Sequence, residues 1–343
     1  MTALGLARFA LLLASLATAG ATAWVLAQNP FAEVFVERGT EEVRAGFARA
    51  VAGVVDEDWL LPRLEAALES GDPDEVEVLV RLADDAGVAL PEELRKDAER
   101  AAARSTGVVA CAACAWDVGA CARLAQVAAC NLTVEVTPLG DLNAVRRGLR
   151  DHLADTPVDR VDLGLGLLGL GATGAVVASG GTSLTLKAGA TVLRVARRAG
   201  TMTPGLRAAV DDAVIGAVRW DNAGRVALLE AAPATMIDTA RTGRIAAIAG
   251  DALRLGRNTS PADGLALMRL ADDPAELAGL ARLSDAAGEA TRPGVRALGK
   301  SRALRLTTRV SDIFLAALGL VTLLVAQLGS LLLFLLRRAL VRR

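Results

Sequence analysis

Tyrosine is absent from this chain, histidine occurs only at His152, and aromatic residues make up 3% of the total. A single histidine excludes most hydrolase and metal-site designs, because these place an imidazole at the centre of a triad or use several as ligands. His152 stands between Asp151 and Leu153 in a charged segment, where a solvated helix face is the ordinary explanation. We therefore predict a protein that is not an enzyme and that holds no metal and no cofactor.

The formal net charge of -1 conceals two halves of opposite sign. Residues 28–162 carry 26 acidic and 14 basic side chains, whereas residues 163–311 carry 12 acidic and 19 basic ones. The acidic first half disfavours nucleic acid as a partner. The basic second half has only Trp220 to stack a base, so we expect no nucleic-acid partner there either.

Long runs without charge are present near both ends of the chain. The run Ile313 to Leu336 is followed by Arg337 and Arg338, and it exceeds the roughly 20 apolar residues that a helix needs to cross the hydrocarbon core. It therefore predicts a transmembrane helix. Small side chains recur in it at every fourth position, and such a stripe allows a second helix to approach closely: Thr322, Ala326 and Ser330.

The other run, Phe9 to Ala32, follows Arg8 and contains Trp24 near its far end. We interpret it as an uncleaved signal anchor, with a cleaved signal peptide as the alternative. The arginines at the carboxyl end indicate a cytoplasmic tail under the positive-inside rule. The expected location is thus a bacterial inner membrane, with the lipid bilayer as a partner, the central domain in the periplasm and the carboxyl terminus in the cytoplasm.

Glycine is concentrated in the uncharged stretch Leu163 to Leu186. A single crossing there would place the basic tail outside, and a return crossing would bury several charges, so we predict a buried helical hairpin with its turn at residues 178–183. A third membrane span is the alternative. Three small residues four apart allow close helix packing in this hairpin: Gly171, Ala175 and Ser179.

Helix signals dominate the rest of the chain. Asp72-Pro73 places a capping acid before a proline at the first helical position, Glu75 follows at the third, and Gly87 ends the unit. Residues 71–87 align without gaps on residues 272–288, which suggests either a duplicated unit or independent use of the same helix signals. Further helices are expected at about 203–219, 234–256 and 261–271. The stretch Leu132 to Thr137 alternates briefly and is expected to be an extended connector.

Four cysteines fall close together: Cys111, Cys114, Cys121 and Cys130. An even number in an exported segment predicts two disulfides, for which three pairings exist. We favour Cys111 with Cys130 and Cys114 with Cys121, nested across a bend near residues 116–119. A zinc or iron–sulfur site and a redox-active Cys111/Cys114 pair are the alternatives.

Two glycine motifs match nucleotide-binding patterns by count. The residues Gly294 to Ser301 satisfy the P-loop spacing, but no hydrophobic strand precedes them, so we interpret them as a helical connector. The glycines from Gly164 to Gly174 satisfy the dinucleotide fingerprint, again with no preceding strand and no acid about 20 residues on. Close helix packing explains them better.

The predicted fold is all-α, with two terminal transmembrane helices that flank an exported multi-helix domain. Its expected regions are a signal anchor (1–32), a helical, solenoid-like region (33–107), a cysteine-containing helical region (108–160), a glycine-rich hairpin (161–200), a second helical region (201–311) and a transmembrane helix with a basic tail (312–343). The strings GLGATGAVVASGGTS, KAGATVLRVARRAG and LARLSDAAG carry a resemblance over the greater part of the chain. The sequence resembles uncharacterised inner-membrane proteins of GC-rich proteobacteria, which implies a membrane location and no particular activity.

These observations predict a non-catalytic structural or protein-interaction protein of the inner membrane. Its partners would be the bilayer and either another protein or a second copy through the transmembrane helices. Two alternatives stay open: a thiol–disulfide redox protein that uses Cys111 and Cys114, and a pore-forming or membrane-remodelling protein that uses residues 163–198.

Overall fold

A computed structural model describes residues 41, 43–103, 107–179, 182–222, 230–231 and 233–305, with the side chains at 138, 152, 170–179, 182–186 and 233–234 left out. The compact unit Phe47–Leu304 holds nearly all of these residues. Both predicted membrane segments, including Thr322, Ala326 and Ser330, lie outside the described residues. Within the described part, no helix combines the length and the apolar character that a membrane crossing requires.

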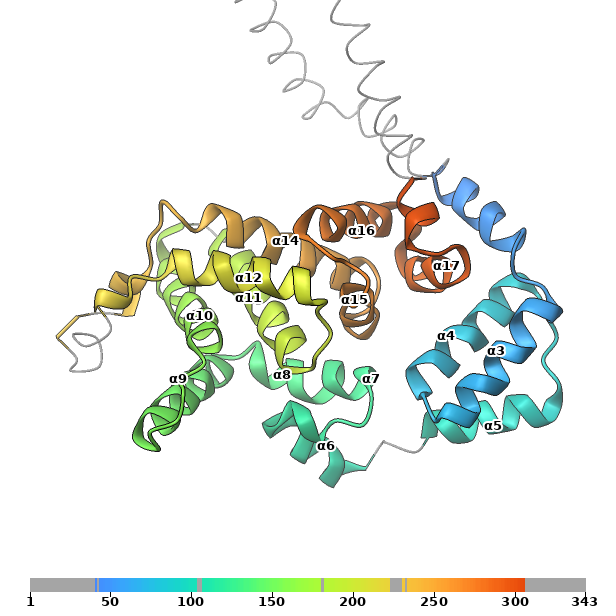
Figure 1. Cartoon of the computed structure of the whole chain (residues 1–343), viewed down its shortest axis with the longest axis horizontal. Coiled ribbons are helices and arrows are strands. Elements are labelled where there is room, and N and C mark those ends of the chain that lie inside the picture. The colour runs from blue at the N-terminus through green and yellow to red at the C-terminus, as the bar shows by residue number, and fades with distance from the viewer. Residues whose placement is uncertain are drawn as a thin grey trace, which may run out of the picture. The chain divides into compact units, whose positions relative to one another are not determined.

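The described chain is all-α, as predicted, and its only β-type pairing is an isolated antiparallel bridge between Val218 and Ile237. Residues 43–52 are also helical. The α-helices drawn in Figure 1 are α3 Glu57–Ser70, α4 Pro73–Ala86, α5 Glu92–Ala103, α6 Val108–Trp116, α7 Leu124–Gln126, α8 Leu132–Glu135, α9 Pro138–Leu153, α10 Arg160–Ser179, α11 Thr182–Arg198, α12 Pro204–Ala217, α14 Gly243–Asn258, α15 Pro261–Met268, α16 Pro274–Ala287 and α17 Thr291–Leu298.

Most helix boundaries lie where the capping residues in the sequence predicted them. The Asp72 carboxylate accepts hydrogen bonds from the backbone N–H groups of Asp74 and Glu75, both at 3.1 Å, and so caps α4. Gly87 ends this helix at φ 69°, a left-handed conformation that glycine adopts without steric cost. In α16 the Asp273 carboxylate plays the same capping part for Glu276 at 2.8 Å. The two aligned segments therefore share the capping acid at their amino ends.

Helices α3, α4 and α5 pack on one another around leucines that are almost fully buried, among them Leu60, Leu64, Leu79 and Leu82. The apolar side chains of α4 recur at helical spacing, so one stripe faces this core. The equivalent positions of α16 are buried as well, including Leu277, Leu280 and Leu283. Helices α4 and α16, whose sequences align, thus bury the same face. Any amphipathic helix that packs on a core must bury its apolar face in this way.

The predicted pair of glycine-rich helices is confirmed: α10 ends at Ser179, α11 begins at Thr182, and the two pack along each other. Helix α10 also packs on α9 and α12, and α11 packs on α14. Glycines allow these close approaches, because a Cβ atom at Gly164 would lie 2.7 Å from Val214 Cγ1, and one at Gly166 would lie 2.8 Å from Ala144 Cβ. The described half of the hairpin is therefore buried among other helices of the same unit.

Two sequence-based expectations are wrong in detail. Leu132 to Thr137 is not an extended connector: residues 132–135 form α8, and the next helix, α9, begins at Pro138. The Thr133 hydroxyl donates to the backbone oxygens of Ala129 and Cys130, which fits a helix and outweighs the β preference of this stretch. The helix expected at 234–256 begins only at Gly243, because residues 233–236 form a separate 3₁₀ turn.

Candidate interaction surface

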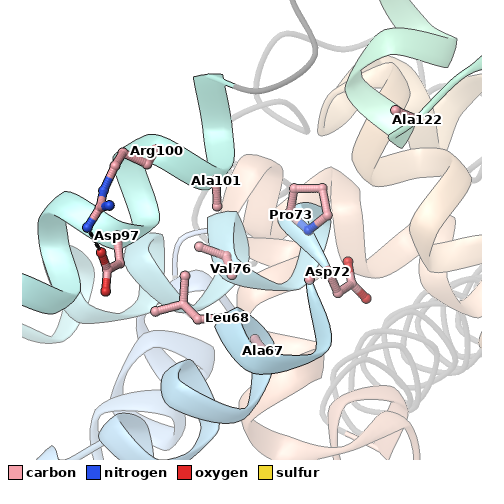
Figure 2. A pocket seen from close by; sticks show the side chains of 10 residues that line it. Ala67, Leu68, Asp72, Pro73, Val76, Asp97, Arg100, Ala101 and Ala122 are labelled. Carbon is pink, nitrogen blue, oxygen red and sulfur yellow. Dashed lines mark hydrogen bonds and ion pairs between the residues drawn. The ribbon is translucent and has the colours of Figure 1, made fainter.

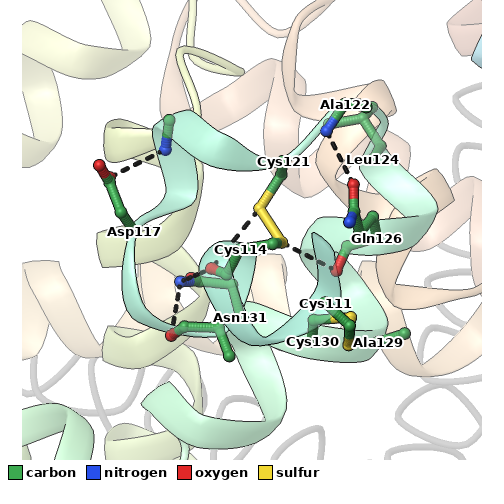
Figure 3. Close-up of a disulfide and its surroundings, with 12 residues drawn as sticks. Cys111, Cys114, Asp117, Cys121, Ala122, Leu124, Gln126, Ala129, Cys130 and Asn131 are labelled. Carbon is green, nitrogen blue, oxygen red and sulfur yellow. Dashed lines mark hydrogen bonds between the residues drawn. A yellow bond between two sulfur atoms is a disulfide. The ribbon is translucent and has the colours of Figure 1, made fainter. Parts of the chain in front are cut away.

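The four cysteines form the two disulfides that the sequence favoured. Cys111 is bonded to Cys130 and Cys114 to Cys121, with Cα–Cα distances of 5.4 and 4.6 Å (Figure 3). They join α6 to the turn after it and to the helical segment Val127–Asn131. Cys111 and Cys114 therefore have different partners, and this arrangement is not that of a redox-active C-x-x-C pair, whose two sulfurs bond to each other.

Buried amide side chains hold the same region together. The Asn131 amide donates to the backbone oxygens of Cys114 at 3.0 Å and Ala115 at 3.3 Å, and the Gln126 side-chain oxygen accepts from the N–H of Ala122 at 2.8 Å. Figure 3 shows these bonds on both sides of the Cys114–Cys121 bridge. Because Asn131 is fully buried, its two bonds satisfy the donors of its amide nitrogen away from water and tie α6 to the segment Val127–Asn131.

Removing the longer bridge should destabilise the protein more than removing the shorter one. The Cys111–Cys130 bond closes a sequence separation of 19 residues and the Cys114–Cys121 bond one of 7. Loop-closure entropy then predicts a loss of about 3 kcal/mol for the double change to serine at 111 and 130, and about 2.4 kcal/mol at 114 and 121. Chemical denaturation of the two double variants measures the difference.

The same cysteines test the expected exported location. With thiols blocked before cells are lysed, mass spectrometry should find all four cysteines paired. Recovery of four alkylated thiols would contradict both the disulfides and an oxidising compartment.

A cluster of buried charges lies where α8, α9, α10 and α11 meet. Arg194 on α11 is 1% exposed, and its guanidinium contacts Asp141 at 2.9 Å and the Glu135 carboxylate at 3.0 Å. Lys187 lies 3.5 Å from Asp141, and Arg198 donates to Glu135 at 2.9 Å. The charges that argued against a membrane crossing of this hairpin are thus buried within the domain and paired there.

At the edge of this cluster, Arg147 forms a two-bond pair with Asp162 at 2.9 and 3.1 Å. Burial, and next the charge of neighbouring Arg147, lower the pKa of Arg198. A hollow of about 180 Å³ opens beside these two arginines. Its rim also carries Asp151, Asp159 and Asp162, so both signs of charge line it. We assign the cluster a structural part in fixing α8 and α9 on the hairpin.

Another buried pair connects distant segments. Asp263 on α15 accepts two hydrogen bonds from Arg81 of α4, at 2.8 and 2.9 Å, and one from Arg292 of α17 at 2.8 Å. Burial alone would raise the pKa of Asp263, but the bonds and charges of the two guanidinium groups lower it below the ordinary value. This carboxylate therefore ties three helices together.

Helix α9 turns its leucines outward. Its inner face consists mainly of small residues, with Gly140, Ala144 and Gly148 buried together with Asp141. Its outer face carries four leucines, each more than half exposed: Leu139, Leu142, Leu149 and Leu153. Isolated exposed leucines need no explanation, but a stripe along one helix marks an interaction surface.

Helix α6 carries further exposed apolar side chains, and its last residue meets α9. Val108, Val109 and Trp116 are among the most exposed large apolar residues of the described chain. The Arg146 guanidinium of α9 lies over the Trp116 ring, 5.7 Å from its centroid, and so links the two helices. We call Val108, Val109, Trp116 and the four leucines of α9 the α6–α9 surface. The disulfides fix its α6 part and the buried charge cluster fixes its α9 part.

A pocket of about 380 Å³ lies between α3, α4 and α5 (Figure 2). Its floor is apolar and includes Leu68 and Val76. The polar groups at its rim already have partners, because Asp72 caps α4 and Asp97 pairs with Arg100. The pocket therefore has room for a small molecule but few polar groups that could bind one, and we do not assign it a ligand.

The remaining sequence candidates are dispersed. Gly171, Ala175 and Ser179 belong to α10, in the stretch whose side chains are not described. Gly294 lies inside α17, where a Cβ atom would overlap the Phe47 ring, and the Lys300 ammonium pairs with Asp272 and Glu276 at 2.6 and 2.9 Å. The P-loop match is thus a helix and its end, as predicted.

Sequence reasoning missed the α6–α9 surface, because leucines at helical spacing ordinarily indicate a buried face. It also missed the buried partners of Arg194, since Glu135 and Asp141 lie far from it along the chain. Among the residues that the structure describes, no group of three or more histidine, cysteine or carboxylate side chains is placed to hold a metal ion. No protein family, curated protein or solved structure matches this chain.

Proposed function

We propose that this chain is a non-catalytic protein-interaction protein of a bacterial inner membrane, and that its periplasmic helical domain docks another protein on the α6–α9 surface. The observation that carries the proposal is the row of four exposed leucines on α9. An exposed apolar row of this kind costs solubility unless a partner covers it at least part of the time.

The construction beneath this surface supports a docking role. Two disulfides and the buried bonds of Asn131 hold α6, while Glu135, Asp141 and Arg194 hold α8 and α9 on the hairpin. A surface that is already rigid loses less conformational entropy when a partner binds. The scaffold therefore favours recognition at this place over a general structural part for the domain.

The two rival functions receive less support. A thiol–disulfide enzyme would need Cys111 and Cys114 to exchange electrons as a pair, and each is bonded to a different cysteine. A pore through residues 163–198 would need the hairpin to leave its neighbours, because α10 packs on α9 and α12 and α11 packs on α14. Moving it would also expose or strand the buried charges of Lys187 and Arg194.

Site-specific photo-crosslinking in living cells tests the docking role. A photoreactive amino acid at Leu142 or Leu149 should give a discrete crosslinked product with one protein, because an apolar partner surface would lie within reach of the probe. The matched control is Ile215 on α12, which is also an exposed large apolar residue. Equal products from Leu149 and Ile215, or none from either leucine, would contradict the proposal.

A further inference from the structure

The outer face of α9 has the spacing of a coiled-coil seam. Leu139, Leu142, Arg146, Leu149 and Leu153 succeed one another at intervals of three, four, three and four residues, which are successive a and d positions of a heptad repeat. At 100° per residue they occupy about 80° of the helix circumference. A seam of this width matches a single partner helix.

Arg146 interrupts the leucines at the centre of the seam. Its Nε donates to the Asn143 side-chain oxygen at 3.0 Å, and its guanidinium lies over Trp116. Of the ion pairs formed within the described part of the chain, none includes Arg146. The Asn143 amide is neutral and the Trp116 ring carries no charge, so no carboxylate among the described residues pairs with the Arg146 guanidinium. A partner that covers the seam must therefore bring a carboxylate to Arg146, or the binding free energy loses the cost of desolvating an unpaired charge.

The flank of the seam adds to this positive charge. Arg150 lies at the e position beside Leu149, with its carboxylate neighbour Asp151 at 3.3 Å on the side away from the seam. That pair is exposed and therefore weak. The centre of the seam and its flank thus present Arg146 and Arg150, respectively, to an incoming helix.

A second copy of the chain would fit this charge pattern poorly. Two copies paired in parallel through α9 would bring the two Arg146 side chains together. In either direction, no acidic residue of α9 stands at the positions that flank the seam. Like charges at such positions disfavour pairing and select another partner.

A bilayer surface fits the geometry poorly. Helices that lie in a membrane interface present an apolar face of roughly 100° or more with their cations on the polar side. Here the face is narrower, and a cation stands in its middle.

We propose that the α6–α9 surface binds an amphipathic helix of another protein, with apolar residues at its own a and d positions and carboxylates placed against Arg146 and Arg150. This inference rests on the proposed docking function and specifies the chemistry of the partner. The leucines would supply the buried apolar contact, and the charge-assisted bonds to Arg146 would select acidic helices over basic ones.

Two designed peptides test the proposal on the full-length protein in nanodiscs of zwitterionic lipid. Both carry leucine at the a and d positions, one has glutamate at e and g, and the other has lysine. Fluorescence anisotropy should show the acidic peptide binding at least about tenfold more tightly, with the difference falling as salt is raised. Peptides that bind equally well would overturn the proposal.

Two variants and a control separate apolar from electrostatic contributions. Arg146→Glu should reverse the preference between the peptides, because the charge at the centre of the seam changes sign. Leu142→Glu combined with Leu149→Glu should remove binding of both. Ile215→Glu places the same charge on an exposed apolar position of α12 and should change neither affinity. An unchanged preference in Arg146→Glu would contradict the assigned role of that residue.

If the bilayer or a second copy of the chain covers the seam instead, the experiments give different results. If anionic lipid in the nanodisc displaces the acidic peptide and zwitterionic lipid does not, the bilayer occupies the seam and the proposal is wrong. If light scattering finds a dimer that Leu142→Glu with Leu149→Glu separates, a second copy occupies it and the proposal is equally wrong. If crosslinking from Leu149 captures one protein but the peptides bind alike, the docking function stands and the acidic helix does not.

Discussion

Replacing Arg194 by alanine should lower the free energy of unfolding by about 3–5 kcal/mol, the usual cost of removing one partner from a buried ion pair. The side chain is 1% exposed and contacts two carboxylates, Glu135 and Asp141, that are themselves almost fully buried. Without the guanidinium, both carboxylates would stay in the interior with less compensation. Urea denaturation of the variant, monitored by circular dichroism, measures the loss.

Arg244 provides the matched control for this experiment. It pairs with Asp212 at 2.6 Å, but both side chains are more than half exposed. Exposed pairs contribute about 0–1 kcal/mol, so Arg244→Ala should leave the unfolding midpoint almost unchanged. Equal losses in the two variants would show that the buried cluster has no special part in stability.

Arg194→Met adds a second comparison. Methionine fills much of the same volume and removes the cost of an empty cavity, but it leaves the two carboxylates with only their weaker or more distant partners, among them Lys187 and Arg198. If the loss comes from unpaired charge, Arg194→Met should be nearly as unstable as Arg194→Ala. A recovery of most of the stability would instead assign the effect to packing.

Local signals in the sequence predicted most of the helix boundaries. An acid before a proline, with a glutamate two residues after the proline, begins α4 and α16, and glycine ends both. These signals work because the unpaired N–H and C=O groups of a helix end need nearby partners, and such partners lie within a few residues. The disulfide pairing was accessible for a similar reason, since all four cysteines fall in one short segment.

The orientation of α9 could not be predicted in the same way. Its leucines repeat at helical spacing, and such a stripe ordinarily indicates the buried face. The structure buries the opposite face because Gly140, Ala144 and Gly148 are small enough for α10 and α8 to approach. In addition, Asp141 on that face must reach Arg194. The requirement comes from residues far along the chain, which a local pattern does not contain.

The buried ion pairs share this limitation. Arg81 and Asp263 are 182 residues apart, and nothing in either neighbourhood indicates the other. Sequence reasoning correctly treated the burial of charged residues in a membrane-crossing hairpin as costly. It did not foresee that carboxylates on α8 and α9 would compensate them inside the domain.

Replacing Asp263 by alanine should cost about 3 kcal/mol, near the lower end for a buried pair, because Arg81 keeps 31% of its side chain exposed and retains some hydration. Three hydrogen bonds to two arginines would be lost, and with them the connection between α4, α15 and α17. Asp263→Asn keeps the shape and removes the charge, so it should show most of the same loss at neutral pH.

The pH dependence of this loss identifies its cause. Because folding lowers the pKa of Asp263, the carboxylate stabilises the folded state above the unfolded pKa of about 3.9, and this stabilisation disappears as the pH falls through the folded value. Asp263→Asn has no such group to protonate. The difference in unfolding free energy between the original protein and Asp263→Asn should therefore be constant from pH 8 to about 5 and shrink below about 4. A difference that persists unchanged at pH 3 would mean that the negative charge of Asp263 is not what stabilises the fold.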